Sequence, residues 1–116
     1  MISKELLSEV LGIDVKKCSL LNKSTNCVNI TYYPHDDFSY TNIKTENIYE
    51  LTHKCKLKMF DLGYAIKIDI LGVEYWNIEV ENCHTGKVCY NEDFDHTEEP
   101  EAIFKACQWI LENKDK

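Results

Sequence analysis

The feature that most constrains the fold is a change of hydrophobic period along the second half of the chain. Apolar residues first recur every three or four positions, at Ile48, Leu51, Cys55, Met59 and Leu62. This spacing places them on one face of a helix over about residues 46–61, which Gly63 ends. The period then becomes two, and a helical stripe returns over residues 102–111. The pattern predicts a helix, a set of strands and a closing helix.

The strands between these two helices are short. We expect them at residues 64–71, 73–80 and 87–90, with tight turns at Gly72 and residues 82–86. Ile66, Ile68 and Ile70 share one face of the first strand, and the face of the second strand that carries Trp76 is expected to be the core side. Short strands joined by tight turns favour an antiparallel meander.

The first part of the chain adds a helix and a hairpin. Ser3 is expected to cap a helix from Lys4 to about Leu11, which Gly12 ends. Residues 15–21 and 27–33 are β-prone runs on either side of a turn at residues 22–26. Residues 34–45 are expected to form an irregular connection, followed by Thr45 or Asn47 as the cap of the next helix.

These elements predict an α+β fold of order α-β-β-α-β-β-β-α, with an antiparallel sheet packed by the two longer helices. The 116 residues are expected to form a single domain, with an N-terminal part at residues 1–44 and an α-β-β-β-α core at residues 45–113.

Six cysteines invite a disulfide interpretation, but a chain of this length can fold without cross-links. Met1 to Leu11 lacks the basic start and apolar core of a signal peptide. We therefore predict a reduced, cytoplasmic protein whose thiols lie in apolar surroundings, Cys89 among them. No apolar run reaches the length of a membrane span.

The net charge of −7 argues against a general nucleic-acid binder and against docking on anionic lipid. It is compatible with a protein partner that has a basic surface. The acidic residues concentrate at Glu92, Asp93, Asp95, Glu98, Glu99 and Glu101. The simpler interpretation is a solvated loop at residues 91–96 followed by a helix start capped by Thr97. The alternative is a surface that imitates nucleic-acid phosphates or presents charge to a basic partner.

Four aromatic residues surround the irregular connection, namely Tyr32, Tyr33, Phe38 and Tyr40. Exposed aromatic side chains would form a binding patch, whereas buried ones would cover the edge of the sheet. The sequence leaves both interpretations open.

Candidate reaction centres are weak. Cys83, His84, Cys89 and His96 come nearest to a ligand cluster, but their spacing matches no common zinc module. His53 lies two residues before Cys55, so their side chains point in different directions on a helix. The four glycines are scattered and form no phosphate-binding loop. We predict no catalytic residue, no metal and no cofactor.

Two stretches carry a family resemblance. Residues 47–56, NIYELTHKCK, and residues 97–111, TEEPEAIFKACQWIL, resemble small phage and prophage proteins of the phage α-β-α sandwich domain family. The likeness covers about residues 45–113 and implies a helix, three strands and a closing helix. It implies no catalytic residues. The hairpin and tyrosine-bearing connection before Thr45 depart from simpler members.

The leading hypothesis is a phage-encoded, non-enzymatic binding protein that engages a host or phage macromolecule, such as a component of a host defence system. One alternative is a small-molecule or nucleotide sponge, oligomeric, with a pocket lined by Tyr32, Tyr40 or Trp76. Another is a minor enzyme that uses a cysteine or a carboxylate. Homo-oligomerisation stays open in each case.

Overall fold

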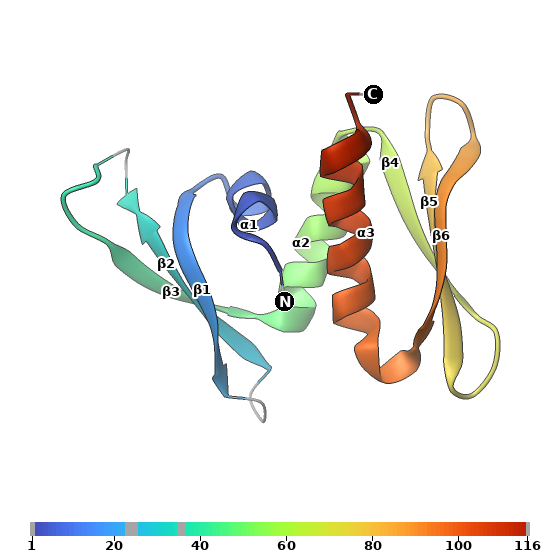
Figure 1. Ribbon diagram of the computed structural model, residues 1–116, viewed down its shortest axis with the longest axis horizontal. Coiled ribbons are helices and arrows are strands. Elements are labelled where there is room, and N and C mark those ends of the chain that lie inside the picture. The colour runs from blue at the N-terminus through green and yellow to red at the C-terminus, as the bar shows by residue number, and fades with distance from the viewer. Residues whose placement is uncertain (1, 23–25, 35–36, 116) are drawn as a thin grey trace. The chain divides into compact units, whose positions relative to one another are not determined.

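The computed structural model describes residues 2–22, 26–34 and 37–115 (Figure 1). The three α-helices of this part of the chain are α1 (Lys4–Leu11), α2 (Ile48–Asp61) and α3 (Glu99–Asn113), and a 3₁₀ turn, η2 (His96–Glu98), precedes α3. The strands are β1 (Asp14–Asn22), β2 (Cys27–Tyr33), β3 (Asn42–Asn47), β4 (Tyr64–Ile70), β5 (Tyr75–Asn82) and β6 (Lys87–Asp95). They form two antiparallel sheets, β1-β2-β3 and β4-β5-β6. The chain divides into two compact units, residues 2–54 and residues 55–116, so the boundary lies inside α2.

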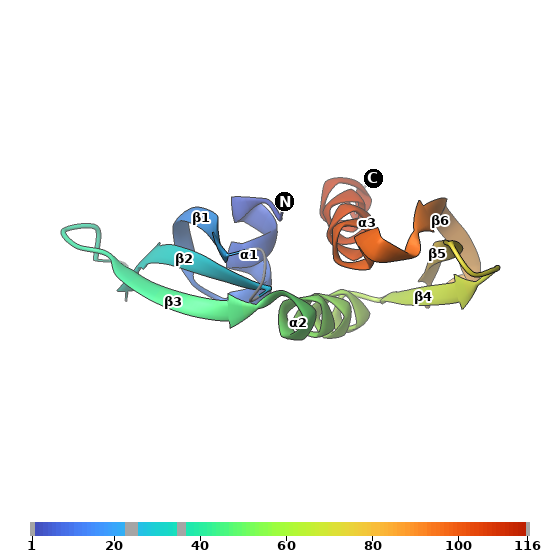
Figure 2. The ribbon, with the colours of Figure 1, turned by 90° about the horizontal axis from the view of Figure 1, so that it is seen from below.

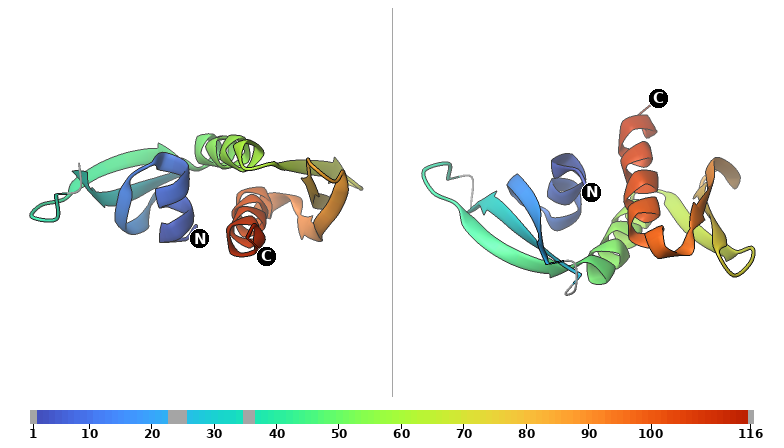
Figure 3. Two further views of the ribbon diagram at one scale, coloured as in Figure 1. Left: turned by 90° about the horizontal axis from the view of Figure 1, so that it is seen from above. Right: turned by 60° about the horizontal axis from the view of Figure 1, so that its bottom comes forward.

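The first unit buries α1 against the β1-β2-β3 sheet, as Figures 2 and 3 show. The Ser3 hydroxyl accepts a hydrogen bond from the Leu6 amide at 3.1 Å, which confirms Ser3 as the cap of α1. Gly12 ends the helix in the left-handed region at φ 66°, where a side chain would be strained. The helix buries Leu6 and Leu7 completely, and β2 contributes Val28 and Ile30 to the same core.

The second unit packs α3 along one face of the β4-β5-β6 sheet (Figures 1 and 2). Its fully buried side chains come from α2, β5 and α3 and are Cys55, Met59, Ile78, Val80, Ile103, Ala106, Cys107 and Ile110. The helical stripes and the Trp76 face of β5 are therefore core-facing, as the hydrophobic periods predict.

The α+β class and the antiparallel pairing are confirmed, but the structure contains one more strand than expected and two sheets instead of one. The end of the predicted irregular connection is β3, in which Asn42 to Asn47 pair with β2. Asn47, and not Thr45, caps α2, because its side-chain oxygen accepts from the amides of Tyr49 at 2.9 Å and Glu50 at 3.2 Å. Thr45 instead donates to Asn29 across the sheet.

The prediction of an acidic loop at residues 91–96 is wrong. Residues 91–95 continue strand β6 and pair with β5 as far as Tyr75–Asp95. The poor strand propensity of Asn and Asp is overridden because their side chains point away from the core while Phe94 points into it. Thr97 is not the cap of α3 either; it lies in η2, and its amide and hydroxyl donate to the Asp95 carboxylate.

The expected burial of Cys89 is also wrong. A register shift in the β5–β6 ladder leaves Cys89 without a paired residue on β5. Its thiol donates to the Val80 carbonyl at 3.4 Å, but the residue is exposed. Residues 23–25 of the predicted hairpin turn, together with His35 and Asp36 of the connection, lie outside the described residues. Across the described ranges, no helix has the length and apolar character needed to cross a bilayer.

Candidate functional site

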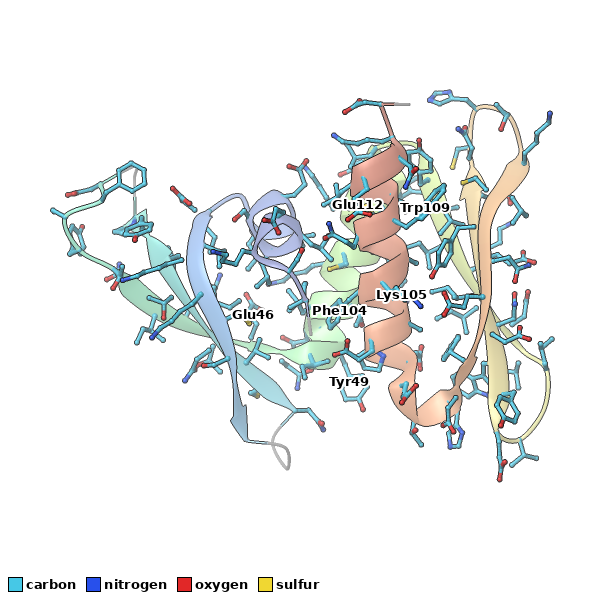
Figure 4. All side chains as sticks on the ribbon, viewed as in Figure 1. Glu46, Tyr49, Phe104, Lys105, Trp109 and Glu112 are labelled. Atoms are coloured by element: carbon cyan, nitrogen blue, oxygen red, sulfur yellow. The ribbon has the colours of Figure 1, made fainter. Side chains whose placement is uncertain are left out.

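The candidate site is built from the two faces of the β4-β5-β6 sheet. The inner face carries the rows Ile66–Val80–Tyr90, Ile68–Ile78–Glu92 and Ile70–Trp76–Phe94, because paired residues of neighbouring strands share a face. This face packs against α3, where the ring centroids of Tyr90 and Trp109 lie 5.5 Å apart. Figure 4 shows Lys105 and Trp109 on the side of α3 that faces the sheet. The alternate residues of each strand therefore lie on the opposite, outer face.

The outer face is strongly acidic. Its five carboxylate side chains, which we call the acidic sheet face, are Asp69, Glu79, Glu81, Asp93 and Asp95. They come from all three strands. The rows across the sheet are Lys67–Glu79–Asn91 and Asp69–Asn77–Asp93. In the second row, the Asn77 amide stands between the two carboxylates. Like charges directly opposite one another would be destabilising, and this amide keeps them apart.

Side-chain hydrogen bonds fix this arrangement. The Asn77 amide donates to the Asp93 carboxylate at 2.7 Å and also to the side-chain oxygen of Asn91. The Asn91 amide in turn donates to Glu79 at 3.3 Å. Asn77 is only 8% exposed, so it is held within the row rather than solvated. These hydrogen bonds orient the carboxylates of Asp93 and Glu79 without supplying any positive charge.

Lys67 is the one lysine among the paired residues on the outer face. It forms an ion pair with Glu81, and the hydrogen bond and charge of that carboxylate raise the pKa of the Lys67 ammonium. The pair is exposed to solvent, so it is weak and screened by salt. Glu79 is the register partner of Lys67, whereas Asp69, Asp93 and Asp95 have no lysine as a cross-strand partner.

The net charge of the chain is concentrated around this sheet. Residues 67–105 contain ten carboxylates and three lysines, whereas the remainder contains ten of each. The whole charge of −7 therefore belongs to this stretch. Charges that lie within about 10 Å of one another are little screened at 0.1 M salt, so the face creates a continuous negative potential.

The structure separates the acidic residues predicted as binding candidates. Asp93 and Asp95 belong to the acidic sheet face. Glu92 points to the inner face, where it accepts from Lys105 at 2.7 Å and from the Tyr90 hydroxyl at 2.5 Å. Hydrogen bonds from Lys105 and then Tyr90 lower the pKa of Glu92, which is thereby engaged within the fold. Glu98 and Glu99 lie at the start of α3, after the sheet has ended.

Sequence reasoning missed Asp69, Glu79 and Glu81 as members of the site. Charged and apolar residues alternate along β4 and β5, and this alternation already places the charged residues of each strand on one face. Only the pairing register brings those side chains beside Asp93 and Asp95.

The aromatic candidates lie in the first unit. Tyr33 and Phe38 are in contact, with ring centroids 5.1 Å apart. Phe38 and Tyr40 are exposed by 64% and 52%, whereas Tyr32 and Tyr33 are half-buried. The four residues thus divide between the two interpretations left open by the sequence, with Phe38 and Tyr40 on the surface.

In the described part of the chain, the thiols and imidazoles form no ligand cluster. Within residues 2–22, 26–34 and 37–115, no three side chains of the metal-ligating types come together. Cys55 and Cys107 are buried side by side, and their mutual hydrogen bond and burial raise the pKa of Cys107. Such thiols are poor nucleophiles because the thiolate is the reactive form.

Comparison with known proteins returns no matching family model, no similar curated protein and no similar solved structure. The resemblance to the phage α-β-α sandwich family therefore stays a prediction from residues 45–113.

Proposed function

We propose that this protein is a phage-encoded, non-enzymatic binding protein that uses the acidic sheet face to engage a basic surface of a host or phage protein. The observation that carries the proposal is the gathering of Asp69, Glu79, Glu81, Asp93 and Asp95 on one sheet face that carries a single lysine. An extended negative face speeds encounter with a basic partner and selects against acidic ones. The phage origin rests on the sequence resemblance alone.

A defence component of the host is the class of partner that we favour, in the host cytoplasm. A component that acts on nucleic acid presents a basic surface to phosphates, and carboxylates on an exposed sheet face can imitate those phosphates. The same charge disfavours the alternative of a nucleotide sponge, since phosphate groups are repelled by the acidic sheet face.

The test is capture of a partner from host-cell lysate, followed by titration of the identified partner with matched charge variants. The face variant is Asp69→Asn, Glu79→Gln and Asp93→Asn together. Each new side chain keeps the shape and an acceptor oxygen, so the hydrogen bonds that Asp93 and Glu79 accept are retained. The control variant removes the same number of exposed carboxylates from the first unit, by Glu5→Gln, Asp14→Asn and Glu50→Gln.

We expect the face variant to lose about 0.6–3 kcal/mol of binding free energy, at roughly 0.2–1 kcal/mol for each of its three exposed charge pairs. The control variant should keep the affinity of the natural chain. Affinity should also fall as salt rises from about 0.05 to 0.5 M. Equal losses in both variants, or no saturable partner at all, would contradict the proposal.

A further inference from the structure

The largest exposed apolar group of the second unit lies at the turn between β4 and β5. Ile70, Leu71, Val73 and Tyr75, which we call the hairpin tip, are exposed by 70%, 63%, 90% and 63%. Turns of this kind ordinarily carry polar residues, Gly, Asn and Asp above all. Here only Gly72 and Glu74 interrupt the apolar run. A contiguous exposed apolar group of this kind marks an interaction surface more often than a scattered one does.

The tip continues both faces of the sheet. Ile70 follows Ile66 and Ile68 along the inner face of β4, but α3 does not cover it. Ile70 pairs with Trp76, whose ring contacts Phe94 and His96 at centroid distances of 6.2 and 6.0 Å. Tyr75 lies on the outer face, opposite Asp95. The tip thus joins an aromatic cluster on one side to the acidic sheet face on the other.

The surroundings of the tip select its occupant. The charged neighbours are Asp69, Glu74, Asp93 and Asp95, and no lysine occurs in the sequence between Lys67 and Lys87. The His96 amide donates to the Glu74 carbonyl at 3.0 Å, which holds the acidic residue 74 close to the end of β6. An acidic rim repels anionic lipid, and it repels the same rim of a second copy of this chain.

We propose that the hairpin tip binds the apolar stripe of a cationic amphipathic segment, whose lysines or arginines then contact the acidic rim. This inference rests on the proposed function and deepens it by naming the kind of partner segment. Leu71 and Val73 enter the apolar stripe, and Tyr75 packs over its margin. Asp69, Asp93 and Asp95 receive the cationic side chains that flank the stripe in an amphipathic helix.

The experiment uses the full chain and two synthetic peptides of 18 residues with equal positive charge. One is an amphipathic Lys/Leu helix and the other a Lys/Ser peptide without an apolar stripe. Affinity is measured by fluorescence anisotropy of labelled peptide. In a Trp109→Phe background, the emission of Trp76 reports occupation of the tip, because Trp76 is then the only tryptophan of the chain.

The tip variant is Leu71→Ser with Val73→Ser. Both side chains are largely exposed, so the fold should persist. The control variant removes two exposed apolar side chains of α2 in the same way, by Leu57→Ser with Phe60→Ser, which are 54% and 62% exposed. Circular dichroism checks that each variant is folded.

We expect the Lys/Leu peptide to bind at least about ten-fold more tightly than the Lys/Ser peptide, since burial of two aliphatic side chains is worth at least one factor of ten. The tip variant should lose that preference, and the control variant should keep it. The Trp76 emission should shift to the blue on binding of the Lys/Leu peptide alone.

Equal affinity for both peptides, or an unchanged preference in the tip variant, would overturn the role of the tip. The acidic sheet face would still stand if the face variant then bound both peptides more weakly. The proposal would also be overturned if the natural chain bound vesicles of anionic lipid, or formed a dimer in sedimentation, and the tip variant did not. Failure of both peptides to bind would overturn the tip proposal and count against the proposed function too.

Discussion

At the scale of single residues, Glu46 is the carboxylate with the most unusual surroundings. It is 6% exposed and lies in the first unit (Figure 4), where it accepts from Lys54 at 3.1 Å and pairs with Lys44 at 3.2 Å. Burial alone would raise the pKa of the Glu46 carboxyl. The hydrogen bonds and charges of Lys54 and Lys44 outweigh burial and hold the pKa below its ordinary value.

We predict that Glu46→Gln lowers the free energy of unfolding at pH 7 by about 1–2 kcal/mol, a figure reduced because both lysines are partly exposed. A lowered folded pKa contributes stability above the unfolded value of 4.5, and that stability is lost as the pH falls through the folded pKa. The difference between the two proteins should therefore shrink at pH 3. Urea denaturation at both pH values measures it, with Glu50→Gln as the exposed control. An equal difference at both pH values would contradict the ionised pair.

The cysteines provide a second residue-scale prediction. Cys55 and Cys107 are fully buried, whereas Cys83 and Cys89 are exposed. Iodoacetamide should label Cys83 and Cys89 in the native protein, and Cys55 and Cys107 only after unfolding, because a buried thiol is both inaccessible and protonated. Mass spectrometry of digested protein reports each site. Rapid native labelling of Cys107 would show that the packing between α2 and α3 is wrong.

At the scale of the elements, the central strand β5 keeps an amide between two carboxylates. Asn77→Ala should lower the free energy of unfolding by about 1–2 kcal/mol, since it removes hydrogen bonds to Asn91 and Asp93. Asn77→Asp should be more destabilising, because a third carboxylate then stands between Asp69 and Asp93. The gap between the two variants should narrow as salt rises.

Urea is the suitable denaturant for this comparison, since it leaves the ionic strength under control. Asn42→Asp is the control, because Asn42 is exposed in β3. If Asn77→Asp proved no worse than Asn77→Ala at low salt, the carboxylates would not share one face.

Local patterns predict most of the elements. The Ser3 cap and the Gly12 stop give α1 its bounds, and the stripe of Leu51, Cys55 and Met59 identifies the buried face of α2. Strand β3 and the second part of β6, residues 91–95, could not be assigned from the sequence, because Asn, Asp and Glu have low strand propensity and only pairing with β2 and β5 makes those segments extended. Sequence reasoning found Asp93 and Asp95 but not their cross-strand neighbours, because only the pairing register shows which residues lie beside them.

At the scale of the whole molecule, the distribution of charge is the property that matters most. Residues 1–66 and residues 106–116 are each balanced in charge, and the excess is confined to residues 67–105. Within that stretch, Glu92 is neutralised by Lys105 on the inner face, while Asp69, Glu79, Asp93 and Asp95 face outward. Folding therefore brings five of the ten carboxylates of this stretch onto one face of the sheet, on which the proposed function depends.

The most direct test is amide chemical-shift mapping of the ¹⁵N-labelled full chain during titration with the cationic Lys/Leu peptide. We predict that the largest changes fall on outward residues of β4, β5 and β6, such as Asp69, Glu79 and Asp93, and on residues 70–75, and that they diminish with added salt. Changes confined to residues 2–54, or insensitive to salt, would contradict the assignment of the acidic sheet face as the binding surface.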